Sequence, residues 1–228
     1  MKFSRGLAAL ILTLLFNTSL TAQYLYKDEV IFNPAFGEQI EKLGYELHQK
    51  TGISLRLIML KELPNKMRIV DYEKELMKDF SEPTVLLTFS EMDSKVDILA
   101  SEPSLYKYFD KKQILSPISS PVQAFVIALM NMDFSDMTSG GTILPLLAQK
   151  AKQGEVLGKY SGSMFNGYAD IAEQIAESKN VVLQNAVGNA NQNSILLVKV
   201  LFYGIIVYGI VLYIKRKLYF IRKKNELS

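Results

Sequence analysis

Few side chains in this sequence could perform catalysis. The chain contains no cysteine and a single histidine, His48. The lack of cysteine excludes disulfides, thiolate zinc sites and cysteine nucleophiles, and a lone histidine excludes a histidine-rich metal site. A serine–histidine–aspartate triad would need His48, but no G-x-S-x-G motif supports one. Because His48 follows the core position Leu47 on a predicted helix, we expect it on the solvated surface.

Glycine-containing segments and carboxylates are the remaining candidates for chemistry. The segments 139–142 (SGGT) and 158–162 (GKYSG) lack the G-x-x-x-x-G-K-[ST] spacing of a phosphate-binding loop. Asp93 and Asp97 belong to a predicted hairpin, where we interpret them as a turn residue and an exposed-face residue. The carboxylates can be judged only from the elements that position them.

The first part of the chain alternates helical and extended patterns. Residues 23–33 have short extended character, and Pro34 opens an amphipathic helix that ends at Thr51 and Gly52. Residues 53–60 form a mostly apolar run, which predicts a buried strand. A second helix is predicted over 67–80.

Two close strands and several helices follow. The runs 85–89 and 96–100 predict an antiparallel hairpin. Helices are expected over 104–114, 142–153 and 161–178, and a loop over 133–141. The run 122–130 fits either a strand or a helix. This order predicts an α/β fold, a small central mixed sheet with a β-hairpin, covered by helices, plus one C-terminal transmembrane helix.

The two ends of the chain set the expected topology. Residues 1–22 have the charged start, apolar core and small-residue end of a secretory signal peptide. Residues 195–214 are mostly apolar and, at ~1.5 Å each, would span the ~30 Å hydrocarbon core of a bilayer. We therefore expect a signal peptide over 1–22, a domain over 23–180, a linker over 181–194, a transmembrane helix over 195–214 and a tail over 215–228.

Charge gives the expected orientation. The tail carries six basic residues, which favour a cytoplasmic C-terminus. The domain would then be periplasmic or extracytoplasmic, held as a single-pass protein at the inner (plasma) membrane. The central region has a net negative charge, so nucleic acid is not an expected partner. The lipid bilayer is the first expected partner.

The central region resembles the TPM domain family, whose members are exported or lumenal. The segment 36–60 (FGEQIEKLGYELHQKTGISLRLIML) resembles the family's first helix, its TG turn and the next strand. The segment 84–101 (TVLLTFSEMDSKVDILAS) resembles its characteristic hairpin. The segment 143–175 resembles its closing helix-loop-helix. The resemblance covers residues 23–177 and agrees with the expected signal peptide and C-terminal membrane helix.

The resemblance implies two alternative functions. TPM relatives are implicated in the assembly or repair of membrane complexes, which implies a non-enzymatic accessory protein with a membrane protein complex as its partner. Some members have been linked to divalent metal and phosphate-ester hydrolysis, which implies a metal-dependent phosphatase. Asp28 and Asp110 match the family's acidic positions and Glu102 lies near them in the pattern, so these three would hold Ca²⁺ or Mg²⁺. The alternative for Asp28 and Asp110 is that they are helix-capping or solvated carboxylates.

Overall fold

The computed structural model describes residues 24–118, 130, 140–152, 154–186, 200 and 202–217. The expected signal peptide, residues 133–139 of the expected 133–141 loop and most of the 122–130 run lie outside the described residues. The elements are β1 (Leu25–Asp28), α2 (Pro34–Thr51), β2 (Ser54–Leu60), η1 (Pro64–Lys66), α3 (Ile69–Leu76), η2 (Met77–Asp79), β3 (Thr84–Ser90), β4 (Lys95–Ala100), η3 (Pro103–Tyr108), α4 (Lys111–Ile114), α6 (Leu144–Leu147) and α7 (Val156–Ser178).

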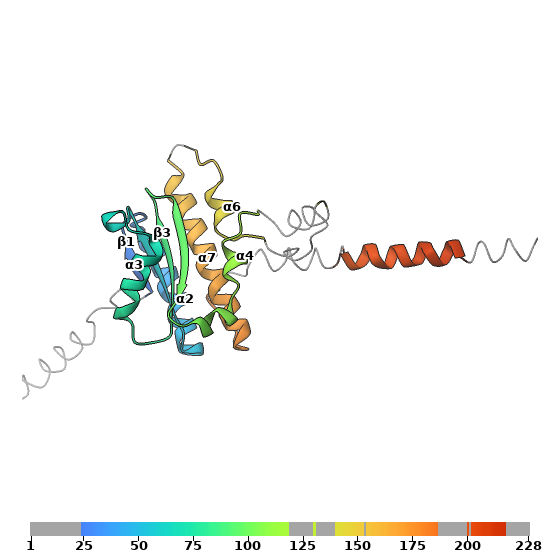
Figure 1. The fold of residues 1–228 in the computed structure, drawn as a ribbon, viewed down its shortest axis with the longest axis horizontal. Helices are drawn as coiled ribbons and strands as arrows, with labels where there is room; N and C mark the ends of the chain where they lie inside the picture. Colours follow the sequence, from blue (N-terminus) through green and yellow to red (C-terminus); the bar gives the residue numbers. More distant parts are fainter. Residues whose placement is uncertain are drawn as a thin grey trace, which may run out of the picture.

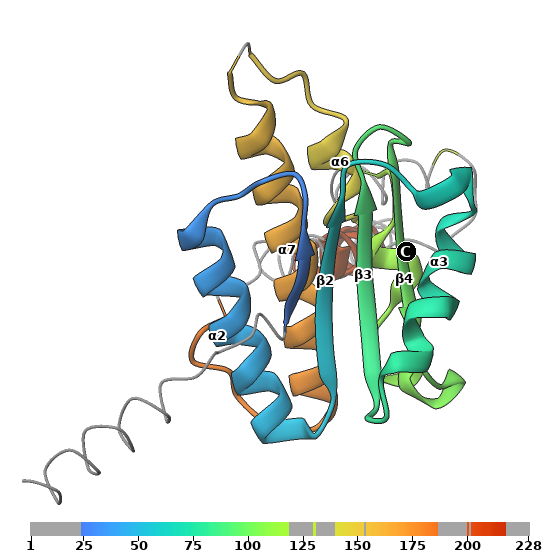
Figure 2. The same cartoon turned by 90° about the vertical axis from the view of Figure 1, so that its left-hand side faces the viewer.

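A four-stranded mixed sheet lies at the centre of the domain, in the order β1-β2-β3-β4. β1, β2 and β3 are parallel, and β4 returns antiparallel to β3 as the expected hairpin. Helices α2 and α7 cover one face of the sheet, and α3 covers the other (Figures 1 and 2). The predicted α/β class, mixed sheet and covering helices are confirmed.

Local signals in the sequence define α2. The Asn33 side chain accepts the backbone N–H of Ala35 at 3.0 Å, and Pro34 occupies the first turn, where no N–H is needed. Gly52 ends the helix with φ 71°, a left-handed conformation that favours glycine, and donates its N–H to the His48 carbonyl. The predicted start and end of this helix are confirmed.

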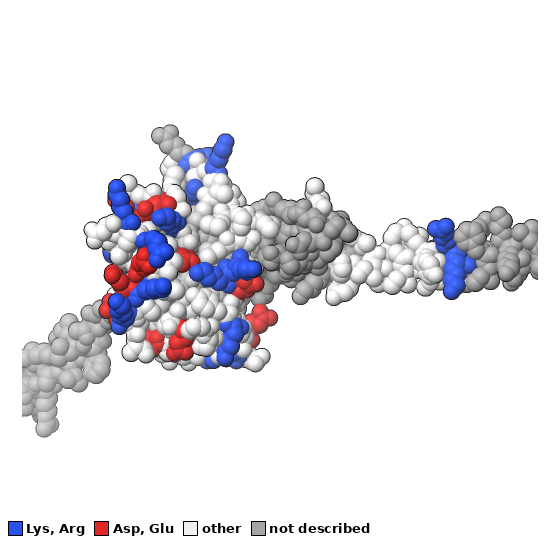
Figure 3. All heavy atoms as spheres, viewed as in Figure 1, with Lys and Arg blue, Asp and Glu red and all other residues white. Residues whose placement is uncertain are grey.

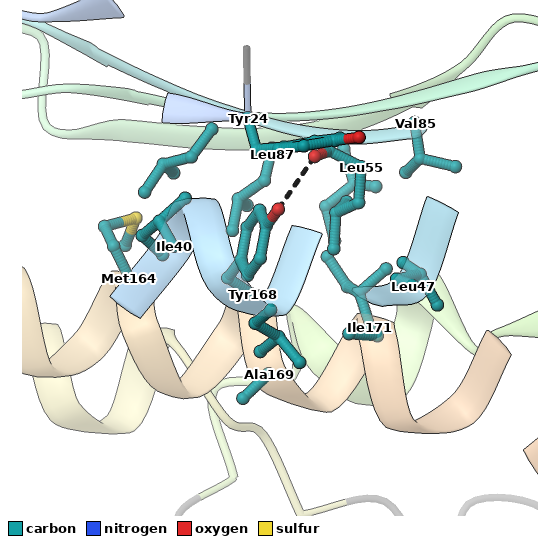
Figure 4. Close-up of a cluster of buried hydrophobic side chains, with 14 of the residues drawn as sticks. Tyr24, Ile40, Leu47, Leu55, Val85, Leu87, Met164, Tyr168, Ala169 and Ile171 are labelled. Carbon is teal, nitrogen blue, oxygen red and sulfur yellow. Dashed lines mark hydrogen bonds between the residues drawn. The ribbon is translucent and has the colours of Figure 1, made fainter. Parts of the chain in front are cut away.

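The main core lies between the sheet and the α2–α7 pair. Tyr168 of α7 is fully buried there, and its hydroxyl donates to the backbone carbonyl of Leu55 on β2 at 2.8 Å (Figure 4). Gly44 of α2 makes this close packing possible. A Cβ at Gly44 would lie 2.4 Å from both the Tyr168 hydroxyl oxygen and Cγ of Tyr24.

The opposite face of the sheet carries a smaller core with one buried cation. Apolar side chains of β2, β3 and α3 pack there. Arg56, which is 8% exposed, donates to the Glu82 carboxylate at 2.6 Å, and its guanidinium carbon lies 4.3 Å from the centre of the Phe80 ring. His48 Nε2 lies 3.8 Å from the same carboxylate and is half-buried, so the prediction of a solvated histidine is wrong.

The free edge of the hairpin is closed by a lysine from α4. Lys111 Nζ lies 2.6 Å from Asp97 Oδ1 and donates to the Ile98 carbonyl at 2.6 Å. A charged side chain on an outer strand also discourages pairing with another chain. Asp97 was expected on an exposed face, but only 13% of its side chain is accessible because α3 and Lys111 cover it.

Two predicted helices are shorter than expected. The 104–114 region divides into η3 and α4, because Phe109 and Asp110 between them are extended. In the described part of the region predicted as helix over 142–153, residues 142–152, the one α-helix is α6, at Leu144–Leu147. The helix predicted over 161–178 is confirmed and starts earlier, at Val156.

The first half of the predicted linker is fixed to the domain. The amides of Gln184 and Asn185 donate to the Glu46 carboxylate at 2.7 and 2.8 Å, and Lys50 donates to the Val182 carbonyl at 2.7 Å. Leu183 is buried against the core. We call residues 181–186 the docked segment. Residues 181–186 of the predicted linker therefore pack against the domain, while 187–194 lies outside the described residues.

Residues 202–217 form a helix that overlaps the predicted transmembrane segment. Its large apolar side chains are exposed, among them Tyr203 at 63% and Ile205 at 63%. In the described part of the chain, no helix combines the length and the hydropathy that crossing a membrane requires.

Candidate functional site

The loops that follow the three parallel strands meet at one end of the sheet. Ligand and partner sites of α/β domains commonly form at this carboxyl end. Here the loops are 29–33 after β1, 61–67 after β2 and the 91–94 turn after β3. We call these three loops the platform.

Asp28, one of the sequence-predicted metal ligands, organises the first loop of the platform. Its Oδ1 accepts the backbone N–H groups of Val30 and Ile31 at 3.0 and 2.8 Å, and its Oδ2 accepts that of Phe32 at 2.8 Å. Three backbone donors converging on one carboxylate make a strong local clamp. The oxygens of Asp28 are thus occupied by its own loop.

The loop held by this clamp gives Phe32 an unusual backbone conformation and an exposed side chain. Its φ of 51° lies in the left-handed region, which a bulky side chain adopts only when the surroundings impose it. Its side chain is 73% exposed, so burial of the ring does not offset the backbone strain. Strained backbone of this kind concentrates at functional sites. An aromatic ring held outward is a recognition element of protein interfaces.

The other carboxylates of the platform connect its loops. Glu29 Oε1 pairs with Lys27 at 2.8 Å and its Oε2 accepts the Lys61 amide at 3.1 Å. Lys61 in turn pairs with Glu91 at 2.5 Å. These contacts tie the three loops into a rigid surface.

The hairpin turn is fixed to the second loop in the same way. Asp93 accepts the Ser90 hydroxyl at 2.6 Å and the Leu63 amide at 2.9 Å, which confirms its prediction as a turn residue. Both hydrogen bonds lower the pKa of Asp93, so it stays ionised in mild acid. Met92 beside it is 64% exposed, a second large apolar side chain at this end of the sheet.

The remaining predicted ligands lie away from Asp28. Because β4 is antiparallel, Glu102 follows it at the opposite end of the sheet, where it accepts the Ser104 hydroxyl at 3.0 Å. Asp110 caps α4 by accepting the Gln113 amide at 3.0 Å, so the capping interpretation is confirmed for Asp110. The structure does not bring the three predicted ligands together. Within the described residues, no three histidine, aspartate or glutamate side chains could share a metal ion.

A buried polar network lies beneath Asp110. Asp170 of α7 is 2% exposed and accepts the Thr142 hydroxyl and the Gln174 amide nitrogen, the latter at 2.9 Å. Gln174 also accepts the Asp110 backbone N–H at 2.7 Å and donates to Gln113 at 2.8 Å. These contacts fasten α4 and the 140–143 loop to α7. We assign the network a structural role.

A strongly perturbed acid lies under α3. Glu73 is completely buried, and burial, reinforced by the neighbouring Asp97 carboxylate, raises its pKa to about 8. Among the described residues neither its oxygens nor the Thr88 hydroxyl makes a well-formed hydrogen bond. Such groups are candidates for function. Glu73 lines none of three cavities, which lie beside Tyr108, along the α6–α7 connection and beneath Leu183, so we do not assign it to catalysis.

Comparison with known proteins adds no assignment. No protein-family model matches the chain, and no curated protein matches it either. The TPM resemblance therefore stays a prediction based on the order of the segments.

Proposed function

We propose that this protein is a membrane-anchored extracytoplasmic accessory protein that assists the assembly or maintenance of a membrane protein complex. The platform is its partner-binding surface. The observation that carries the proposal is Phe32, which Asp28 holds outward in a strained conformation. A binding surface gains affinity when its aromatic anchor is already fixed in the bound geometry.

The helix at 202–217 supports the membrane part of the proposal. Its residues are uncharged up to Lys215, and a cluster of basic residues follows, visible as a white helix with a blue end in Figure 3. Exposed apolar surface of this extent marks an interaction site. Lipid is the occupant that fits, because the apolar side chains surround the helix on all sides.

Site-specific photocrosslinking tests the partner-binding surface in intact membranes. A photoreactive phenylalanine analogue at position 32 of the full chain should give one discrete crosslinked product. The same analogue at Tyr45, which is 57% exposed on α2, is the matched control and should give none.

Substitution tests the same point without a probe. Phe32→Ser should abolish recovery of the crosslinked partner by affinity purification, while Tyr45→Ser leaves it intact. Recovery of the same partner with both variants would exclude the platform as the binding surface. If neither position crosslinks and no complex is recovered, the accessory function itself is wrong.

A further inference from the structure

A groove lies at the end of the domain opposite the platform. It is lined by η3, α4 and the last turn of α7 and has a volume of about 580 Å³. Tyr108 lines it, and its backbone carbonyl accepts the Ser178 hydroxyl at 3.0 Å. The hydrogen bond joins the two walls of the groove, so it is a fixed feature of the fold.

Lysines surround this tyrosine although the domain as a whole is acidic. The ammonium groups of Lys179 and Lys107 lie 4.4 and 4.8 Å from the centre of the Tyr108 ring. Both lower the pKa of Tyr108, a sign of positive potential at the groove. Lys112 lines the groove as well and is exposed.

These three lysines have no ion-pair partner within the described part of the chain. No carboxylate of the described residues lies within ion-pairing distance of Lys107, Lys112 or Lys179. By contrast, Lys111 beside them is paired with Asp97. Although Asp110 and Glu177 also line the groove, it offers lysines without an ion-pair partner next to an amphipathic ring, the combination that favours a membrane–water interface.

The chain leaves the domain next to this groove. Glu177 lines the groove and also a small cavity beneath the docked segment. The docked segment ends at Ala186, and the predicted membrane helix starts at Ile195. The eight residues between them reach at most ~28 Å. An anchored domain would therefore keep this end close to the bilayer.

We propose that Lys107, Lys112 and Lys179 around Tyr108 form a docking surface for anionic phospholipid headgroups, which orients the domain on the membrane. This assignment rests on the proposed membrane anchor. Since each lysine near an anionic surface adds attraction, the three together favour the docked orientation by up to about 100-fold at low salt. Screening in about 0.5 M salt should remove most of this preference.

Fluorescence energy transfer in lipid nanodiscs tests the docking surface with the full chain. The chain has no cysteine, so Ser104→Cys gives a single labelling position on η3, and acceptor dye is placed on lipids. Transfer should be higher in discs that contain about 30% phosphatidylglycerol than in discs of pure phosphatidylcholine.

Two triple variants with the same change of charge provide the comparison. Lys107→Gln, Lys112→Gln and Lys179→Gln together should abolish the increase. The control combines Lys66→Gln, Lys150→Gln and Lys152→Gln, three exposed lysines at the platform end and in the α6–α7 connection, and should retain the increase. Far-UV circular dichroism of both verifies that the fold is kept.

The outcomes separate this assignment from the function on which it rests. Equal transfer in both kinds of disc, or an increase that survives the groove substitutions, would overturn the docking surface alone. Binding of a glutamate-rich peptide in phosphatidylcholine discs, lost in the groove variant, would assign the groove to an acidic protein segment and overturn the lipid assignment. A chain that does not enter discs would refute the anchor and the docking surface together.

Discussion

Asp28 Oδ2 accepts the backbone N–H of Phe32 at 2.8 Å, four residues further along the chain. This contact fixes a loop in which Phe32 has φ 51° and an exposed aromatic ring. The resemblance predicts Asp28 as a metal ligand. In the structure its carboxylate oxygens instead accept backbone amides and hold the loop. The arrangement leads to a first prediction.

Asp28→Asn should weaken the loop although the side chain keeps its shape. An amide has one acceptor oxygen, so its NH₂ group would face either Phe32 N–H or the amides of Val30 and Ile31. We expect a loss of about 1–3 kcal/mol in the free energy of unfolding, measured by urea denaturation. The control Asp71→Asn removes an exposed ion pair with Arg68 and should cost clearly less. Equal losses of unfolding free energy in the two variants would mean that the hydrogen bonds to Asp28 do not stabilise the fold.

Glu73→Gln should change how stability depends on pH. Because its folded pKa is about 8 and its ordinary value is 4.5, the folded state holds a proton that the unfolded state releases. The stability associated with neutral Glu73 is complete below pH 4.5 and is lost as pH rises towards 8, at up to ~1.4 kcal/mol per pH unit. The ion pair between Asp97 on β4 and Lys111 on α4 faces this site. The substitution should make the free energy of unfolding depend less on pH and should stabilise the protein at pH 8. If the pH dependence of the unfolding free energy is unchanged, Glu73 is not a buried neutral acid.

Glu46→Gln should release the docked segment without unfolding the domain. Hydrogen bonds from Lys50, Gln184 and Asn185 lower the pKa of Glu46 to about 2, against the effect of burial. Its contribution to stability is therefore present above pH 4.5 and is lost as pH falls towards 2. We expect faster amide exchange at 184 and 185, measured by hydrogen–deuterium exchange. Glu38→Gln on the same helix removes an ion pair with Lys42 and should leave this exchange unchanged.

Gly44→Ala should destabilise the domain, whereas Gly158→Ala should not. The added methyl at position 44 would overlap Tyr168 and Tyr24, and overpacking typically costs about 1–3 kcal/mol. At Gly158 on α7 nothing lies within 4 Å, so alanine should instead add up to ~1 kcal/mol through helix propensity. Thermal unfolding of the two variants measures the contrast. Similar midpoints would mean that α2 can move away from α7 at little cost.

Periodicity in the sequence predicts the sheet and the two long helices because burial determines them. β2 and β3 are buried on both faces, and their continuous apolar runs are the direct consequence. The helix predicted over 104–114 fails for a local reason. Pro103 starts a 3₁₀ helix and Asp110 prefers the extended cap position, so one apolar pattern covers two short elements.

The candidate sites are less visible in the sequence. Nothing in the residue type of Phe32 encodes a positive φ, since the surrounding loop imposes it. The lysines at 107 and 179 are brought together only by the fold. The position of Glu73 can be read from the sequence, because it lies four residues after Ile69 and three before Leu76, on the apolar side of α3.

The sheet separates the platform from the exit of the chain at the opposite end. Seven-residue strands are about 23 Å long, so a domain that rests on its lysine groove with the strands upright would display Phe32 about that far above the headgroups. A membrane partner with only short extramembrane turns would not extend far enough from the bilayer to contact the Phe32 ring. If the proposed function holds, the partner complex would need a subunit whose extramembrane part reaches the height of the platform.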